Sequence, residues 1–109
     1  MAKLKIVIIE DEFFAADHLK TLVEDLGYLV VDVFHSGEDF LKGTDWSFDI
    51  AIVDIFLSEE MLGLDVAKHL QERQRPFIFL TANKDELTLK RAALLSPKAY
   101  ISKPFNPND

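Results

Sequence analysis

The run Leu4-Lys5-Ile6-Val7-Ile8-Ile9, followed at once by Glu10-Asp11-Glu12, decides the fold of this chain. The first six residues are rich in β-branched side chains and apolar except for lysine. This predicts a short strand buried on both faces, as strands are in a parallel sheet. The three acidic residues stand where the strand ends. Because the ligand crevices of parallel α/β sheets lie outside the carboxyl ends of their strands, the run also indicates where a functional site belongs.

Segments of the same kind recur along the chain, and residues at helical spacing separate them. Further strands are predicted at residues 29–33, 50–53, 76–80 and 99–101. Helices are predicted around residues 19–26, 36–42, 66–70 and 87–95. Gly27 and Gly43 supply the stops of the first two helices. Alternating strands and helices imply crossover connections, so we expect an α/β fold with a doubly wound five-stranded parallel sheet and helices on both faces.

Composition and charge exclude several classes of protein. The 109 residues suit one domain, and 49% of them are hydrophobic, enough for a buried core. The formal net charge of −7 argues against contact with nucleic acid or anionic lipid. Without cysteine there is no disulfide framework and no thiolate zinc site. Since we find no signal-peptide pattern and no long apolar run, we expect a soluble, cytoplasmic domain that contacts no membrane.

Polar residues follow the other predicted strands as well. Asp54 comes directly after the third strand, Thr81 after the fourth, and Lys103 just past the fifth. Because the carboxyl ends of parallel strands share one edge of the sheet, we expect these side chains to face the same crevice as Glu10 and Asp11. Each residue alone has an ordinary interpretation, as a helix cap or a surface residue. Their joint placement is what indicates a site.

Each residue type at these strand ends has a chemical use. Clustered carboxylates repel one another unless a cation binds between them, and oxygen ligands of this kind suit Mg²⁺. A carboxylate such as Asp54 can also act as a nucleophile and form an aspartyl phosphate. That transfer needs positioning and charge neutralisation, which the Lys103 ammonium group and a divalent cation supply. The hydroxyl group of Thr81 can donate a hydrogen bond to a phosphoryl oxygen.

Four short motifs occur in order along the chain. They are Ile8-Ile9-Glu10-Asp11-Glu12, Ile52-Val53-Asp54, Leu80-Thr81-Ala82 and Tyr100-Ile101-Ser102-Lys103-Pro104-Phe105. In order and spacing they resemble the acidic motif, the phosphoacceptor strand, the fourth-strand motif and the closing motif of one family. That family is the receiver domain of bacterial two-component response regulators. The resemblance covers nearly the whole chain and implies the flavodoxin-like fold of receivers.

The resemblance implies roles for the acidic residues and the loop beside them. Asp54 would accept a phosphoryl group from a phosphohistidine on a histidine kinase or a histidine phosphotransfer protein. Asp11 and Asp54 would hold Mg²⁺, with Glu10 acting directly or through water. The main-chain carbonyl of Phe56 would be a further metal ligand.

The resemblance also implies how the domain responds to phosphorylation. Lys103 would contact the phosphoryl group, and Thr81 would bond it and move toward it. Tyr100 would be the aromatic switch that turns inward when Thr81 moves. The Lys103–Pro104 bond would be cis, which an X–Pro bond permits at modest cost. Such a domain is a switch rather than a turnover enzyme.

The sequence departs from the family pattern around the site and before the last strand. The loop over residues 56–62 lacks the usual proline and is longer than the common form. Ser96-Pro97 replaces the usual Gly-Ala, and the proline is expected to hold Ser96 in an extended conformation. Phe56 and Asn83 occupy positions where the family tunes dephosphorylation. Because the side chain of Phe56 cannot orient an attacking water, we hypothesise a long-lived phosphoryl state.

A fourth departure is the absence of the family's fifth helix. We therefore expect residues 1–109 to be a receiver domain truncated before that helix, or one that a partner completes. The apolar surface left uncovered would favour association. A homodimer and an attached output domain are both possible partners.

Two other functions stay open. A Mg²⁺-dependent phosphatase with an aspartyl nucleophile usually carries a second acid two residues later, where this chain has Phe56. A degenerate receiver, acting only as an interaction domain, would not need the intact set of Asp11, Asp54, Thr81 and Lys103. Both are therefore less favoured than the switch.

The histidines and the first two phenylalanines offer no second site. His18, His35 and His69 have no ligand spacing, and we predict surface or boundary positions for them. Phe13 and Phe14 are expected to combine core packing with a place at the rim of the site, and the sequence does not divide these two roles between them.

Overall fold

The computed structural model describes residues 3–57, 62–81 and 86–103, in which five strands alternate with four helices. The strands are β1 (Lys5–Ile9), β2 (Leu29–Phe34), β3 (Ile50–Asp54), β4 (Phe77–Thr81) and β5 (Ala99–Ser102). The helices are α1 (Phe13–Asp25), α2 (Gly37–Gly43), α3 (Gly63–Glu72) and α4 (Glu86–Ala93). No helix within these ranges is long and apolar enough to cross a membrane. The predicted alternation is confirmed.

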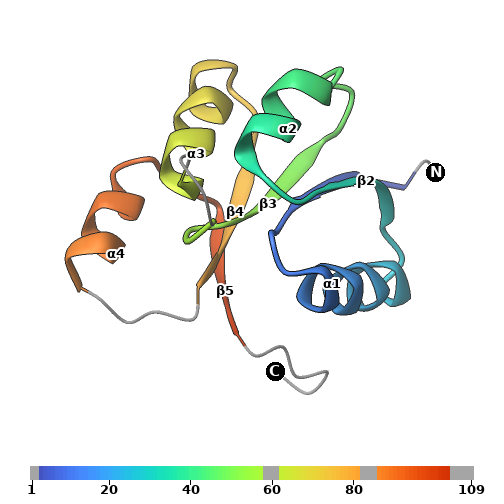
Figure 1. Cartoon of the computed structure of the whole chain (residues 1–109). Helices are drawn as coiled ribbons and strands as arrows, with labels where there is room; N and C mark the ends of the chain where they lie inside the picture. The colour runs from blue at the N-terminus through green and yellow to red at the C-terminus, as the bar shows by residue number, and fades with distance from the viewer. Residues whose placement is uncertain (1–2, 58–61, 82–85, 104–109) are drawn as a thin grey trace.

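The strands form one parallel sheet in the order β2-β1-β3-β4-β5 (Figure 1). From β1 the chain connects to β2 on one side, and it then crosses back to β3 on the other side of β1. The connections thus change direction between β1 and β3, which is the point in such a sheet where a ligand crevice opens. Neighbouring strands also end together, because Ile9 pairs with Val53 and Thr81 pairs with Ser102. Residues that follow these strands therefore emerge at one edge of the sheet, as the sequence predicts.

Helices cover the two faces of the sheet unequally, with α1 on one face and the other three helices on the opposite face (Figure 1). On the α1 face, Ile8 and Ile52 pack with Leu19. The opposite face holds the larger apolar cluster, which includes Val7, Ile9, Phe40, Val53, Val66, Leu70, Phe79 and Ala92. Successive residues of β1 thus enter different clusters and are all buried after Lys5, as expected for an interior parallel strand.

Local signals in the sequence set the ends of the first two helices. Ser36 caps α2, since its hydroxyl oxygen accepts a hydrogen bond from the backbone N–H of Asp39 at 3.0 Å. Gly27 follows the end of α1 with a φ of +99°, a conformation that glycine adopts without steric strain. The predicted start of α2 at Ser36 and the predicted stop of α1 at Gly27 are both confirmed.

The expectation for Ser96 is wrong. Its φ is +58°, in the left-handed region, and its backbone is therefore not extended. The backbone N–H of Ser96 donates to the carbonyl of Ala93 at 3.1 Å, which closes the end of α4. A helix commonly ends on a left-handed residue, and here that requirement overrides the restriction that Pro97 places on the residue before it.

Gly63 begins α3 at the point where this helix touches the end of β3. Its backbone N–H donates to the carbonyl of Ile55 at 3.0 Å. A Cβ atom placed on Gly63 would lie 1.9 Å from the carbonyl oxygen of Asp54. No side chain fits in that space, so the contact between α3 and the end of β3 requires glycine.

Gly63→Ala should lower the free energy of unfolding by about 3 kcal/mol, because the added methyl group forces α3 away from the main chain of Asp54. Urea denaturation followed by circular dichroism measures the change. Gly43→Ala is the matched control, since its Cβ would meet the ring of Phe34 at 3.1 Å, and a side chain can shift. Equal losses in the two variants would contradict the prediction.

Candidate functional site

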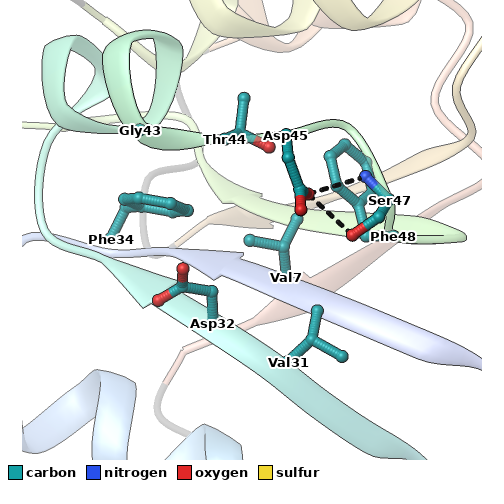
Figure 2. A pocket seen from close by; sticks show the side chains of 9 residues that line it. All are labelled: Val7, Val31, Asp32, Phe34, Gly43, Thr44, Asp45, Ser47 and Phe48. Atoms are coloured by element: carbon teal, nitrogen blue, oxygen red, sulfur yellow. Dashed lines mark hydrogen bonds between the residues drawn. The ribbon is translucent and has the colours of Figure 1, made fainter.

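One pocket, of about 160 Å³, lies between β2 and the loop after α2 (Figure 2). None of the residues predicted for the site lines it. Its exposed acid Asp45 is already engaged, because the hydroxyl and the N–H of Ser47 donate to its carboxylate at 2.6 and 3.0 Å. These bonds hold the pKa of the Asp45 carboxyl below its usual value. One carboxylate oxygen of this acid, Oδ1, is therefore already occupied by Ser47.

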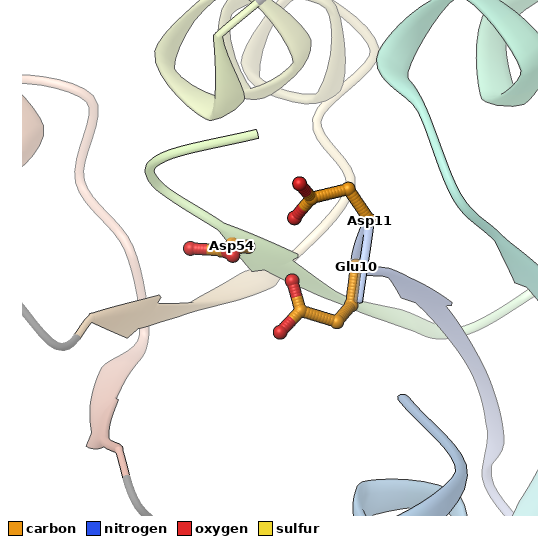
Figure 3. A group of neighbouring side chains, drawn as sticks. All are labelled: Glu10, Asp11 and Asp54. Atoms are coloured by element: carbon orange, nitrogen blue, oxygen red, sulfur yellow. The ribbon is translucent and has the colours of Figure 1, made fainter. Parts of the chain in front are cut away.

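Three carboxylates converge instead where β1 and β3 end (Figure 3). Glu10 and Asp11 directly follow β1, and Asp54 is the last residue of β3. Because Ile9 pairs with Val53, the next residues of the two strands emerge side by side. One carboxylate oxygen from each acid lies within 4.8 Å of the others. The structure thus brings together the three acids that the sequence assigned to one crevice.

Lys103 connects these acids to the far side of the sheet. It directly follows β5, and its backbone N–H donates to the carbonyl of Thr81 at 3.0 Å. Its ammonium group donates to Asp54 Oδ2 at 2.8 Å and also to Glu10 Oε1. One side chain therefore joins the ends of β1, β3 and β5.

Glu10 is fully buried in this crevice, with 0% of its surface exposed. Its Oε2 atom has no hydrogen-bond partner among the described residues. Burial raises the pKa of the Glu10 carboxyl to about 8; the neighbouring Asp54 carboxylate adds to this effect and Lys103 opposes it. Burial alone would lower the pKa of the Lys103 ammonium, but its bonds to Asp54 and Glu10 outweigh burial and raise that pKa.

The charges of this crevice do not balance within the described part of the chain. When Glu10 is ionised, the Lys103 ammonium group pairs with the carboxylates of Glu10 and Asp54, and a carboxylate oxygen of Asp11 lies within 4.8 Å of theirs. A buried oxygen without a donor, such as Glu10 Oε2, is costly to maintain. A divalent cation would supply two positive charges and a partner for that oxygen, and an all-oxygen donor set suits Mg²⁺. The residues present therefore fit this metal.

The other predicted residues lie around the crevice. The backbone N–H of Phe56 donates to Asp54 Oδ1 at 3.0 Å, so both oxygens of that carboxylate are held. Thr81 is buried as the last residue of β4. Tyr100, in β5, is 43% exposed, and its ring centroid lies 6.1 Å from that of Phe79. The tyrosine ring is thus on the surface in this structure.

Three expectations fall outside the described residues. They concern Asn83, the loop residues 58–61 and the Lys103–Pro104 bond. The described residues that flank the loop differ in environment, since Leu57 is buried in the core and Leu62 is exposed.

Sequence reasoning missed the part that His35 has in this region. Its Nδ1 atom lies 2.9 Å from the main-chain oxygen of Glu10, and its ring stacks on that of Phe13 with centroids 3.9 Å apart. Phe13 and Phe14 are 70% and 91% exposed, so the core packing expected of this pair is wrong. A signal was present in the sequence, because His35 comes two residues after the predicted strand at 29–33 and so lies near the same sheet edge as Glu10.

Comparison with known proteins identifies the family. The family model described as the response regulator receiver domain matches residues 6–109. The transcriptional regulatory protein CpxR of Escherichia coli K12 is 36% identical over 103 residues, covering 94% of this chain and 44% of CpxR. The response regulator SaeR of Staphylococcus epidermidis RP62A is 35% identical over 106 residues, covering 95% of this chain and 45% of SaeR. The chain thus spans about half the length of these relatives.

Solved structures agree with this result. The signal receiver domain of a modulated diguanylate cyclase from Desulfovibrio desulfuricans G20 has a TM-score of 0.88 at 35% identity, covering 98% of this chain and 86% of that one. A CheY-like receiver domain protein from Methanospirillum hungatei JF-1 has a TM-score of 0.86 at 24% identity, covering 99% and 87%, and supports the fold alone. With its sheet, its strand-end acids and these relatives, the chain belongs to the response regulator receiver domains of two-component signalling systems.

Proposed function

We propose that this domain is a phosphorylation-controlled switch in which Asp54 accepts a phosphoryl group from a phosphohistidine. The surroundings of Asp54 carry the proposal, because it is buried at the end of β3 with its Oδ2 2.8 Å from Lys103 Nζ. Carboxylate oxygens of Glu10 and Asp11 lie within 4.8 Å. A nucleophile beside a fixed ammonium group and a potential cation site has the parts that phosphoryl transfer needs.

The proposed transfer exchanges one bond of phosphorus for another. A carboxylate oxygen of Asp54 forms a P–O bond while the P–N bond to the donor imidazole breaks, and the electron pair leaves on nitrogen. Lys103 neutralises part of the negative charge on the phosphoryl oxygens. The backbone N–H of Phe56 holds the carboxylate in a fixed orientation before the reaction.

Glu10, Asp11 and Asp54 are the proposed Mg²⁺ ligands, with the main-chain carbonyl of Phe56 as a further one. The buried Oε2 atom of Glu10, which has no hydrogen-bond partner in the described part of the chain, supports this assignment. When bound, Mg²⁺ supplies positive charge that offsets the carboxylates and the phosphoryl oxygens.

Thr81 and Tyr100 are the proposed moving parts of the switch. Thr81 ends β4 beside Lys103, to which its carbonyl is hydrogen-bonded, so its hydroxyl group belongs to the edge where a phosphoryl group would form. The phosphoryl group would bring negative charge and strong acceptor oxygens. Because Tyr100 is exposed in this structure, an inward turn of its ring would change the surface that partners meet.

The proposed donor is a histidine kinase or a histidine phosphotransfer protein, and the proposed recipient of the signal is an output domain or a second copy of the chain. We also propose that the domain acts in the cytoplasm, as a binding module rather than a turnover enzyme. Its chemistry would then be limited to its own phosphoryl transfer and a slow loss of phosphate, because Phe56 offers no side-chain group to orient water.

Incubation with acetyl phosphate and Mg²⁺ should add one phosphate to the protein, and Asp54→Asn should abolish the gain because an amide is not a comparable nucleophile. Intact-mass spectrometry measures both. Asp17→Asn, the same exchange at an exposed acid on α1, should label like the wild type.

A different outcome of the labelling experiment would select one of the other two functions. An unlabelled wild type, under conditions where a control receiver labels, would favour a degenerate receiver. Continuous release of phosphate from an unrelated ester would favour a phosphatase.

The affinity for Mg²⁺ should rise by roughly tenfold per pH unit from about pH 6 to about 8, because a cation must displace the proton from Glu10. Calorimetric titration across this range measures the affinity. Glu10→Gln should flatten the dependence, since an amide does not titrate, although its remaining affinity should be weaker. A wild-type affinity that stays constant with pH would contradict the prediction.

The free energy of unfolding of the metal-free protein should change in the opposite direction to the Mg²⁺ affinity, and fall as the pH rises. The pKa of Glu10 is about 8 in the folded state against 4.5 as the reference, so its contribution to stability is fully present below about 4.5. That contribution is lost as the pH rises through 8, and Glu10→Gln should remove this part of the pH dependence.

A further inference from the structure

The main chain of Glu10 is held on both sides by the end of β2. Its backbone N–H donates to the carbonyl of Phe34, the last residue of β2, at 2.9 Å. The carbonyl oxygen of Glu10 lies 2.9 Å from Nδ1 of His35, the residue that follows Phe34. Glu10 directly follows the last residue of β1, and β2 is the edge strand that pairs with β1. These two bonds therefore extend the pairing of β1 with β2 as far as Glu10, the first acid of the crevice.

The direction of the second bond is decided by its chemistry. A carbonyl oxygen only accepts, so His35 Nδ1 must carry the hydrogen and donate it. The ring of Phe13 lies against the His35 ring with centroids 3.9 Å apart and an interplanar angle of 31°. An aromatic contact of this kind restrains the imidazole ring and so helps to keep Nδ1 directed at the carbonyl.

The carbonyl that receives this bond belongs to the peptide unit between Glu10 and Asp11. Fixing one peptide plane sets the starting direction of both side chains, because the Cα atom of each acid is part of that plane. The carboxylates of these two residues and of Asp54 lie within 4.8 Å of one another in this structure. A rotation of the plane would turn Glu10 and Asp11 away from that arrangement together.

We propose that His35 is a positioning residue for the acidic crevice, acting through its Nδ1–H bond to the Glu10 carbonyl with Phe13 supporting its ring. The proposal rests on the proposed Mg²⁺ site. It differs from that site in naming a group that contacts neither the cation nor the phosphoryl group. Partners that hold metal ligands in place contribute to affinity through geometry, typically by 10-fold or more.

The experiment separates the donor atom of His35 from the bulk of its ring. His35→Phe keeps a ring that can stack on Phe13 but lacks the donor, and should weaken Mg²⁺ binding by about tenfold in calorimetric titrations at one fixed pH. His35→Asn places an amide nitrogen near the position of Nδ1 and should restore most of the affinity. Phe13→Leu should cause a smaller loss of Mg²⁺ affinity. Phe14 is the exposed neighbour of Phe13, and Phe14→Leu should bind Mg²⁺ like the wild type.

A second readout does not involve the metal. In the metal-free protein, ¹³C chemical shifts of the Glu10 and Asp54 carboxyl groups should move in His35→Phe and return toward the wild-type values in His35→Asn. Thermal denaturation of each variant reports whether the fold is intact. If the wild type binds no Mg²⁺, the proposed metal site fails, and these shifts still decide whether His35 positions Glu10.

Two results would overturn the proposal. One is a His35→Phe variant with wild-type Mg²⁺ affinity and unmoved carboxyl shifts. The other is a His35→Asn variant that loses as much affinity as His35→Phe, since this would assign the effect to packing of the ring rather than to the donated hydrogen bond.

Discussion

The shared ammonium group of Lys103 is the interaction on which the carboxyl edge of the sheet depends. It bonds Asp54 Oδ2 at 2.8 Å and also Glu10 Oε1, and so joins residues that lie 49 and 93 positions away in the chain. Without a nearby cation, two carboxylates at the buried ends of adjacent strands would repel each other in a medium of low polarity. Lys103 makes their burial tolerable, yet one positive charge does not balance all the acids present.

Main-chain groups take part in each of the other contacts that hold the site. Gly63 allows α3 to rest directly on the carbonyl of Asp54, and the N–H of Phe56 holds Asp54 Oδ1 from the other side. His35 bonds the carbonyl of Glu10. Because phosphoryl transfer is governed by positioning and charge more than by acid–base chemistry, a crevice fixed through its backbone suits that reaction.

Much of the fold was predictable from short patterns. Apolar runs bounded by polar strand ends predicted all five strands. Ser36 and Gly27 marked helix ends correctly, because capping and left-handed turns depend on neighbouring residues alone. Ser96 was predicted wrongly, since two local rules conflicted there and the closure of α4 prevailed. Phe13 was assigned in part to the core because its helix face cannot be inferred until the packing partners of α1 are known.

The sequence alone determined that acids, a hydroxyl group and a lysine stand at the ends of four of the five strands, because strand periodicity and residue order are local properties. Only the tertiary structure decided which of them touch. Register placed Glu10 beside Asp54, and the crossover order brought Lys103 to both. Burial raised the pKa of Glu10 and left its Oε2 atom without a partner among the residues that the structure describes. His35 entered the site in the same way, because its contact with Glu10 depends on the pairing of β1 with β2, which no local pattern specifies.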